Sequence, residues 1–504
     1  MKIDIGPVTR IEGHLNVQTT VENGVVVDAR CEGEMFRGFE ILLRGRDPLD
    51  SQQITQRICG VCPYAHAIAS SYAQEDAYRL SVPPNGRILH NLIQGANHLY
   101  DHLLHFYQLC ALDYVDITAV LEYTGRDPEL SKVRDWVKAE VDSGKRYPAA
   151  PFLPRLDGKY LDNRDANLGA IKNYLSAMNM EKKANQAAAI FGGRFPHATS
   201  IFPGGCTQNA SIDLILAYQS LIREVRDFIH LKYIPDVLAV AGAFPEYWEI
   251  GQSKGGFLSY GHMPLGPARN SERLLAPGVL LGDQLSAVEL GKIRQDVNHA
   301  LYSSASNLTV RDAAIVPQPD KGGEAYSWIM APRYDGQMVE VGPAARVMVD
   351  YAQGHNPEIK KLVERFAGHA NISANQLNSV LGRHLSRAIL AAVIADFVLA
   401  ESERLDPAAP TMAELDPPAS GEGFGITEAS RGALLHYIRI ENYKIAKYEC
   451  VVPTTWNASP RDDQGTPGAM ESALIGTRVQ NPEEQIESKR IVRSFDPCLA
   501  CAVH

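Results

Sequence analysis

The sequence predicts a mostly α-helical fold with peripheral β structure, an α+β arrangement whose core is a bundle of long helices. Apolar residues recur at spacings of three and four between residues 85 and 121, which predicts one long amphipathic helix that is broken at most once. The same spacing predicts further helices at about 163–190, 211–233, 284–303 and 373–405. Apolar and polar residues alternate near both ends of the chain, which predicts small N- and C-terminal β pieces.

The predicted β pieces have their own local signals. Asn23-Gly24 follows an alternating segment and supplies the left-handed turn of a tight hairpin. Residues 434–459 alternate again and are followed by several prolines, which indicates short strands and ordered loops. Three segments rich in Pro and Gly are expected to be long loops: 149–157, 251–277 and 406–425.

Composition excludes several classes of protein. The chain has 504 residues with 49 Lys and Arg against 59 Asp and Glu, a formal charge of −10, so it lacks the basic character that binds nucleic acid. The longest apolar run, Ala388 to Ala400, is shorter than the ~20 residues that span a bilayer and contains Asp396. No transmembrane segment is therefore expected. The N-terminus lacks the features of a secretory signal, so export would need a signal on a partner.

The cysteines carry the strongest chemical signal. There are eight, too few for a disulfide scaffold in a chain of this length, and four form two Cys-x-x-Cys pairs near opposite ends. Cys59 and Cys62 are followed by His66, and Cys498 and Cys501 are followed by His504. Four thiolates in two such pairs are typical of a site for a soft or borderline metal. A structural zinc ion, two disulfides and a redox dithiol remain alternatives, although zinc ribbons usually bring their halves within about twenty residues.

The position of the two pairs also bears on domain organisation. A length of 504 residues corresponds to roughly three average domains, but a site shared by both ends has to be closed by the whole fold. We therefore expect one integrated body over 1–504. It would comprise an N-terminal β region with the first pair (1–66), a helical core (85–405) and a C-terminal β and loop region with the second pair (426–504).

Six sequence blocks around these pairs resemble one family. The blocks are Arg10-Ile11-Glu12-Gly13-His14, Phe36-Arg37-Gly38-Phe39-Glu40, residues 57–66, Ala331-Pro332-Arg333-Tyr334, Ser430-Arg431-Gly432-Ala433 and residues 496–504. In this order they resemble the large, catalytic subunit of nickel-iron hydrogenases of the uptake type, along nearly the whole chain. A nickel-iron-selenium subgroup of that family uses selenocysteine where this sequence has Cys498.

The resemblance implies a fold, a cofactor and an activity. The fold would be that of nickel-iron hydrogenase large subunits, and the activity would be reversible heterolytic cleavage of dihydrogen to protons and electrons. Cys59 and Cys498 would bind nickel alone. Cys62 and Cys501 would bridge nickel to an iron that carries carbon monoxide and cyanide.

The resemblance also implies roles for residues around the metals. Glu12 would accept the proton beside a terminal cysteine, and Arg431 would lie over the metals with Asp101 and Asp496 as its carboxylate partners. His66, four residues after Cys62, would donate a hydrogen bond to the bridging sulfur of Cys62. Ser430 stands where the family usually has proline, so the environment of this arginine is expected to differ from the usual one.

A second ion is implied near the C-terminus. Glu40, the backbone carbonyl of Cys450 and His504 match the ligands of a magnesium-like ion, and oxygen donors suit a hard cation. Precursors in the family carry a C-terminal extension, so a chain that ends at His504 would be the processed form.

The implied partner is an iron-sulfur small subunit. Cys31, Cys110, Cys206 and Cys450 are isolated in the sequence, so this chain cannot hold iron-sulfur clusters of its own. An obligate heterodimer that passes electrons to a downstream carrier is expected. The resemblance favours a periplasmic location, or a peripheral membrane location through the partner, and leaves a cytoplasmic one open.

Two other functions remain as alternatives. The first is a fold-related, quinone-binding subunit of a respiratory complex, which would not need the four metal-binding cysteines. The second is a protein in which zinc has only a structural role, which elemental analysis would distinguish.

Overall fold

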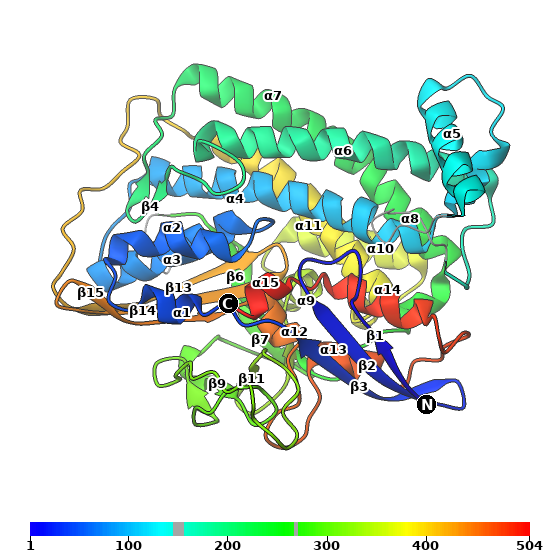
Figure 1. Cartoon of the computed structure of the whole chain (residues 1–504). Coiled ribbons are helices and arrows are strands. Elements are labelled where there is room, and N and C mark those ends of the chain that lie inside the picture. Colours follow the sequence, from blue (N-terminus) through cyan, green and yellow to red (C-terminus); the bar gives the residue numbers. More distant parts are fainter. Residues whose placement is uncertain (145–155, 267–270) are drawn as a thin grey trace.

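Long helices form the upper layer of the molecule in Figure 1. The computed structural model describes residues 1–144, 156–266 and 271–504. The central helices are α3 (Pro63–Tyr78), α4 (Pro84–Leu104), α6 (Arg164–Gly192), α7 (Ile212–Phe228) and α11 (Val380–Ser402). Helix α4 packs against both α6 and α11, and α7 packs against the same two helices. The predicted helical core and its α+β class are confirmed.

Helix α4 is the central element, and nearly all of it is buried. Its predicted apolar residues, such as Leu92 and Leu99, are completely buried, but its polar side is buried as well, including His98 and Asp101. The α-helix ends at Leu104 and continues as a π-helical segment over His105–Cys110 and then as short 3₁₀ turns. The predicted break in the long helix therefore lies at this π segment.

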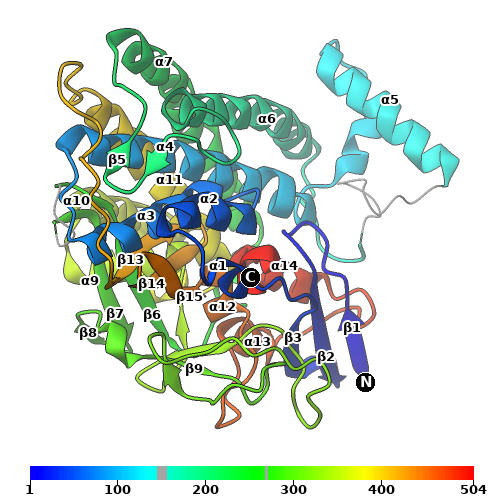
Figure 2. The same ribbon diagram turned by 60° about the vertical axis from the view of Figure 1, so that its left-hand side comes forward.

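The remaining helices are shorter and surround this core. They are α1 (Phe39–Leu43), α2 (Ser51–Thr55), α5 (Pro128–Ser143), α8 (Ile234–Ala243), α9 (Pro343–Gln353), α10 (Pro357–Ala370), α12 (Pro453–Asn457), α13 (Ala469–Leu474), α14 (Ile486–Phe495) and α15 (Leu499–Ala502). Helix α5 projects from one end of the body in Figures 1 and 2. Within the three described ranges, no helix combines the length and the apolar character needed to cross a membrane.

Small antiparallel sheets lie below the helices. The N-terminal hairpin is confirmed as part of β1 (Lys2–Ile5), β2 (Leu15–Glu22) and β3 (Val25–Gly33), and the C-terminal strands as β13 (Gly421–Ala429), β14 (Gly432–Glu441) and β15 (Lys444–Val451). Strand β13 lies across α3. Glycines make this close approach possible, since a Cβ at Gly425 would lie 1.8 Å from the carbonyl oxygen of Ala69 on α3.

The middle of the chain contains strands that the sequence analysis did not predict. A four-stranded sheet has the order β12-β6-β7-β8, and a three-stranded sheet has the order β10-β9-β11. Their strands are β6 (Gly256–Pro264), β7 (Arg273–Leu281), β8 (Gln284–Ser286), β9 (Ile293–Asp296), β10 (Leu308–Thr309), β11 (Ala331–Tyr334) and β12 (Val339–Glu340). A two-stranded sheet pairs β4 (Ile201–Phe202) with β5 (Gly205–Cys206).

Several sequence predictions are therefore wrong. The loop expected at 406–425 contains the start of β13, and the C-terminal region expected to be strands and loops also contains α12, α13, α14 and α15. The helix expected at 284–303 is replaced by β8, a 3₁₀ turn and β9, and the loop expected at 251–277 contains β6 and the start of β7. Apolar spacing at 284–303 fits a helix, but Gly282 adopts a left-handed φ of 59° and turns β7 directly into β8. Strand β9 then alternates buried Ile293 with exposed Arg294, so sheet pairing overrides the helical periodicity. The expected loop at 149–157 lies almost entirely outside the described residues.

The two ends of the chain meet in the middle of the molecule. Glu12 pairs with Cys498 in an isolated β-bridge, and the backbone N–H of Leu499 donates to the carbonyl of Glu12 at 2.9 Å. Figure 1 shows the C-terminus beside α1 and α15, with the N-terminal strands next to them. The fold thus brings the two Cys-x-x-Cys pairs to one place.

Candidate metal centre

Four buried cysteines from opposite ends of the chain form one cluster. Their sulfur atoms all lie within 4.8 Å of one another. Cys59 Sγ lies 3.4 Å from Cys498 Sγ, and Cys62 Sγ lies 3.4 Å from Cys501 Sγ. All four are free thiols rather than disulfides. The arrangement is a four-sulfur site for one or more metal ions.

Local structure explains how each pair presents its sulfurs. Cys62 directly precedes α3, and its backbone N–H, together with that of Val61, points at Cys59 Sγ at 3.4 and 3.2 Å. Cys498 directly precedes α15, and Cys501 lies within it. The backbone N–H of Cys498 is held by the Thr454 hydroxyl at 2.9 Å. Both pairs are therefore fixed by backbone hydrogen bonds.

The chemistry of the donor set fits metal ions. Burial raises the pKa of the Cys498 and Cys501 thiols well above the usual value. Four neighbouring thiolates in such a site would carry a large negative charge, and Arg431 is the cation whose charge acts on Cys498 and Cys62. A full set of thiolates thus requires metal cations for balance.

Glu12 lies at the edge of the cluster. Its Oε2 lies 3.1 Å from Cys498 Sγ and accepts a hydrogen bond from the Ala500 N–H at 2.9 Å. Burial, and next the neighbouring Cys59, raise the pKa of this carboxyl group. Glu12 also lines an open cavity with His14 and Arg57. The carboxyl group therefore stands between the sulfurs and a cavity.

Arg431 lies on the turn between β13 and β14 and is completely buried. Its guanidinium donates to both oxygens of Asp101 at 2.9 and 3.2 Å and to Asp496 Oδ1 at 3.0 Å. Burial raises the pKa of Asp101 to about 6 against the opposing effect of Arg431. For Asp496, burial raises the pKa, but Arg431, His105 and Arg387 together outweigh it and lower the pKa. Arg387 lies 3.3 Å from the other oxygen of Asp496. The predicted arginine and its two carboxylates do meet.

Ser430 adds a contact that a proline would lack. Its hydroxyl donates to Asp101 Oδ2, and this bond lowers the pKa of Asp101. The Ser430 carbonyl accepts from Arg346 at 2.6 Å. The departure from the family pattern therefore adds a hydrogen bond to the carboxylate that holds Arg431.

His66 contacts the cluster from α3. Its Nε2 lies 3.4 Å from Cys501 Sγ, and its Nδ1 lies 3.1 Å from Nε2 of His436 on β14. The sequence analysis expected His66 to contact Cys62, but the structure places it against the sulfur of Cys501, from the second pair.

The predicted second ion site is also assembled. His504 Nε2 lies 2.7 Å from Glu40 Oε1 and 3.1 Å from the Cys450 carbonyl oxygen. The buried carboxyl of Glu449 faces Glu40, and burial, followed by Glu40, raises its pKa to about 8. Two buried carboxyl groups beside a carbonyl oxygen and an imidazole fit a hard divalent cation.

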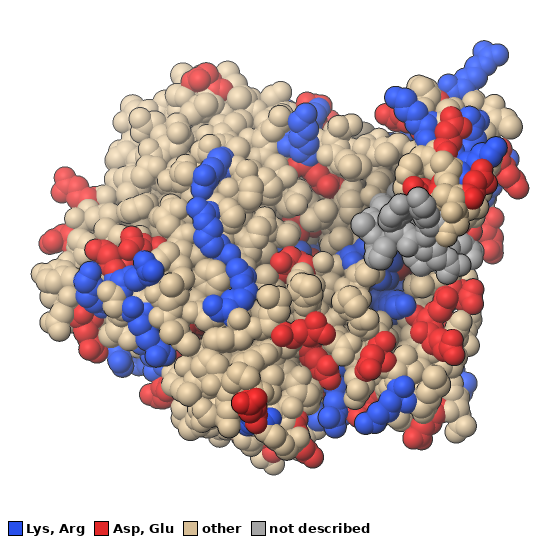
Figure 3. Space-filling view, viewed as in Figure 1, with Lys and Arg blue, Asp and Glu red and all other residues tan. Residues whose placement is uncertain are grey.

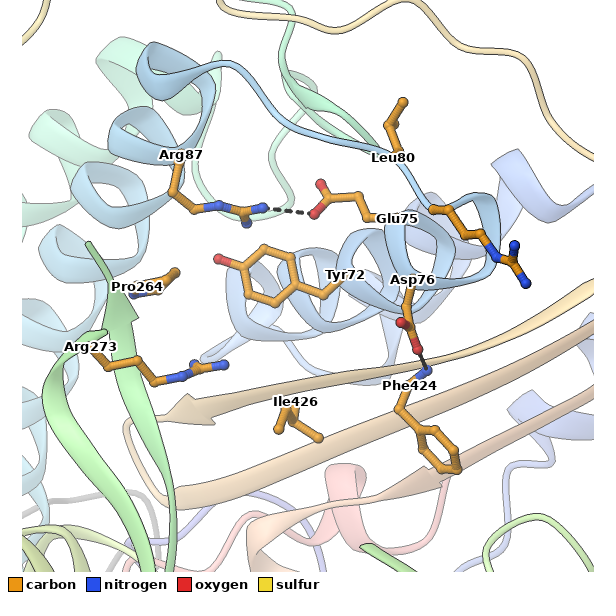
Figure 4. Close-up of a pocket in the computed structure, with 10 residues that line it drawn as sticks. Tyr72, Glu75, Asp76, Leu80, Arg87, Pro264, Arg273, Phe424 and Ile426 are labelled. Carbon is orange, nitrogen blue, oxygen red and sulfur yellow. Dashed lines mark hydrogen bonds and ion pairs between the residues drawn. The ribbon is translucent and has the colours of Figure 1, made fainter. Parts of the chain in front are cut away.

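A separate pocket lies at the other end of α3. Figure 4 shows Tyr72, Glu75 and Arg87 facing one another across it. Arg87 donates to Glu75 at 2.9 Å and lies 4.5 Å from the centre of the Tyr72 ring. Glu75 also accepts from the Gly204 N–H at 3.1 Å. These contacts tie α3 to neighbouring segments, and the pocket contains none of the predicted site residues.

Comparison with known proteins decides the family. A family model for nickel-dependent hydrogenases matches residues 37–504, and a HoxL-like model matches residues 2–32. The chain belongs to the nickel-dependent hydrogenase family. It is a large subunit, the part of these enzymes that cleaves dihydrogen reversibly into protons and electrons, and it is an oxidoreductase.

Named relatives span the whole hydrogenase chain. It is 38% identical to the periplasmic [NiFeSe] hydrogenase large subunit of Desulfomicrobium baculatum, with 100% of this chain and 95% of the relative covered. It is 34% identical to the uptake hydrogenase large subunit of Bradyrhizobium diazoefficiens, with the same coverage. Among solved structures, the reduced Ni-Fe-Se hydrogenase of D. vulgaris Hildenborough matches with a TM-score of 0.88, 38% identity and full coverage of both chains.

The family, fold class and activity predicted from the sequence are thus confirmed. Sequence reasoning missed several residues that the fold brings to the site, and these are Arg387, His436, Tyr448, Glu449 and Thr454. None of them belongs to a recognisable spacing pattern, so only the three-dimensional fold identifies them.

Proposed function

We propose that the four cysteines hold a binuclear nickel-iron centre in this hydrogenase. Cys59 and Cys498 would hold nickel alone, and Cys62 and Cys501 would be shared between nickel and an iron that carries carbon monoxide and cyanide. The observation that carries this proposal is that four buried sulfurs lie together. Cys59 Sγ is 3.4 Å from Cys498 Sγ, and Cys62 Sγ is 3.4 Å from Cys501 Sγ. When bound, the metal pair supplies the electron-rich site at which dihydrogen is polarised and split.

Glu12 has the proton-transfer role in this proposal. Its Oε2 lies 3.1 Å from Cys498 Sγ, within reach of a proton that leaves that sulfur. The raised pKa of the carboxyl brings its proton affinity closer to that of a metal-bound thiolate. The adjoining cavity, lined by His14 and Arg57, offers the proton a way on from the cluster.

Arg431 has an electrostatic role. Its guanidinium is fixed by Asp101 and Asp496, so the positive charge stays over the cluster without rearrangement. The paired carboxylates keep the guanidinium protonated at every working pH. The geometry thus supports a fixed cation that polarises the substrate.

The Glu40, Cys450 and His504 site is proposed to hold Mg²⁺ or a similar divalent ion. The ion would balance the buried Glu40 carboxylate and tie α1 and β15 to the last residue of the chain. Its role would be structural, because His504 contacts Cys501 through the backbone and not through the sulfur: the Cys501 carbonyl accepts a hydrogen bond from His504 Nδ1.

An iron-sulfur small subunit is the proposed partner. Met35, Ile41 and Leu42 are exposed apolar residues in or near α1, and Met35 lines the cavity beside Glu12. Charged side chains are sparse over the upper left of the face in Figure 3, where Figure 1 draws α7, and a stripe of Lys and Arg crosses the left centre of this face. Exposed apolar residues beside the metal centre suit docking of a subunit that removes electrons. The electrons would pass to a downstream carrier in the periplasm or at the membrane.

Cysteine substitutions test the assignment in the complex with the small subunit. Cys62→Ser should abolish hydrogen-dependent dye reduction and lower the nickel content of the chain, because a hydroxyl is a poor bridge between soft metals. Cys206→Ala is the matched control, since Cys206 is equally buried and lies outside the cluster. Full activity and nickel content in Cys62→Ser would contradict the proposal.

A further inference from the structure

A line of buried hydrogen bonds runs from the cluster into the C-terminal sheet. It starts at Cys501 Sγ and passes through both ring nitrogens of His66 to His436 Nε2, at 3.4 and 3.1 Å. His436 Nδ1 then lies 2.9 Å from the hydroxyl of Tyr448. All four side chains are buried. The line is therefore shielded from water, which could otherwise replace any of its members.

Strand register explains why the members meet. His436 on β14 lies opposite Cys450 on β15, and Tyr448 is two residues from Cys450. Residues two apart on a strand share one face of the sheet, so Tyr448 is the diagonal neighbour of His436. His66 on α3 packs against this sheet, and its ring lies 5.3 Å from the His436 ring, centre to centre.

The donors and acceptors in this line can point in only two directions if both rings are neutral. Each neutral imidazole has one N–H and one bare nitrogen, so the choice at one ring fixes the choice at the next. In one direction Tyr448 donates to His436, His436 donates to His66, and His66 Nε2–H donates to Cys501. In the other direction every bond is reversed, and the bare Nε2 of His66 faces the sulfur.

The sulfur decides between the two directions. A metal-bound Cys501 is a thiolate, which only accepts hydrogen bonds, so a bare nitrogen facing it would repel it. Burial also lowers the pKa of His436 well below its usual value, which disfavours a charged ring in the line. The Ser70 and Ser51 side chains act on the Tyr448 hydroxyl in the direction that lowers its pKa, which is the effect of groups that donate to its oxygen.

We propose that Tyr448 and His436 are positioning residues that hold the proton of His66 on Nε2, so that Cys501 receives a permanent hydrogen bond. This inference rests on the proposed nickel-iron centre, because it requires Cys501 to be a thiolate. The hydrogen bond withdraws electron density from the bridging sulfur and hence from the metals it joins. Tyr448 thus affects the metals without touching them.

Infrared spectroscopy of the complete heterodimer tests this proposal. In His436→Leu, no side chain donates to His66 Nδ1, so the His66 ring can adopt the other tautomer. The hydrogen bond to Cys501 is then lost, and electron density at iron should rise. The carbon monoxide band should then move to lower wavenumber. Tyr448→Phe, which removes one hydroxyl, should move the band in the same direction by less, and His436→Gln, which keeps a donor, should restore it toward the wild-type position.

The control is Tyr437→Phe. Tyr437 follows His436 on β14, and its hydroxyl donates to Glu422 on β13. The band of this variant should stay at the wild-type position. Nickel content measured on each variant separates a spectral shift from poor assembly, and Tyr448→Phe decides the outcome if His436→Leu loads no metal. Loaded Tyr448→Phe protein with unmoved bands would overturn this inference alone. Wild-type protein without such bands would overturn the nickel-iron assignment and this inference with it.

Discussion

The proton-transfer role of Glu12 depends on one contact, between its carboxyl group and Cys498 Sγ at 3.1 Å. Glu12→Gln keeps the size of the side chain and can still accept from the Ala500 N–H, so the metals should stay bound. Exchange of protons between dihydrogen and water should fall roughly 10²–10⁴-fold, because an amide cannot carry the proton. Isotope exchange between D₂ and water measures this directly.

Glu34→Gln is the matched control for this substitution. Glu34 is exposed and directly precedes Met35 in the chain, but it does not line the cavity beside Glu12. It should exchange isotopes at the wild-type rate. Wild-type exchange in Glu12→Gln would remove Glu12 from the proton pathway.

Ser430 gives a prediction about pH. Its hydroxyl stabilises the Asp101 carboxylate, which has a pKa of about 6, so Ser430→Ala should raise that pKa. A protonated Asp101 loses its ionic hold on Arg431, and activity should therefore fall as the pH drops through this pKa. In Ser430→Ala the fall should begin at a higher pH than in wild type.

The pH profile of kcat checks this shift. Ser430→Thr keeps a hydroxyl and should retain the wild-type profile. If kcat falls at the same pH in Ser430→Ala and in wild type, the Ser430 hydroxyl does not affect the pKa of Asp101.

At the residue scale, sequence reasoning found groups that belong to contiguous motifs. Glu12, His66, Arg431 and the four cysteines all stand in short blocks with a fixed spacing, and the fold brings them together. His436, Tyr448 and Arg387 stand alone in otherwise ordinary strands and helices. Their contacts depend on register and helix packing, which no local pattern encodes.

At the scale of elements, apolar periodicity predicted several of the long helices but missed α3, which is buried on nearly all sides. It predicted α6, α7 and α11, and it placed the start of α4 within a residue or two. It could not show that the polar side of α4 is buried too, because a polar face on a helix normally faces water. Asp101 lies on that buried side and binds Arg431, so α4 forms part of the site as well as the core.

The close packing of α4 against α11 gives a stability prediction. A Cβ at Gly95 would lie 2.4 Å from Val398 Cγ1 on α11, so Gly95→Ala should force the two helices apart at a cost of about 1–3 kcal/mol. Gly169→Ala in α6 is the matched control. Nothing lies within 4 Å of its added Cβ, and alanine in an exposed helix should stabilise the protein by roughly 0.5–1 kcal/mol.

Thermal unfolding of the purified variants measures both effects. Gly95→Ala should lower the Tm, and Gly169→Ala should leave it unchanged or raise it. Equal Tm values for the two variants would contradict the packing described for α4 and α11.

At the scale of the whole molecule, chain length serves to close one site. The β-bridge between Glu12 and Cys498 joins the first and last segments of a chain of 504 residues, with the helical core between them. The sequence showed two distant Cys-x-x-Cys pairs and so predicted that they must meet. It could not show how, because the meeting depends on the packing of α3 on β13 and of the N-terminal sheet on the last residues.

The four remaining cysteines are buried single thiols, and none joins the four-sulfur cluster. These four thiols, all in the described part of the chain, lie on separate elements and form no second cysteine cluster, which supports an iron-sulfur partner. The exposed apolar residues beside the metal centre are the surface on which we expect that partner to dock.

Metal analysis combined with infrared spectroscopy tests the central claim most directly. Purified protein should contain one nickel and one iron per chain, and its infrared spectrum should show bands from carbon monoxide and cyanide bound to iron. Zinc in place of nickel and iron, with no such bands, would contradict the assignment of Cys59, Cys62, Cys498 and Cys501 to a binuclear nickel-iron centre.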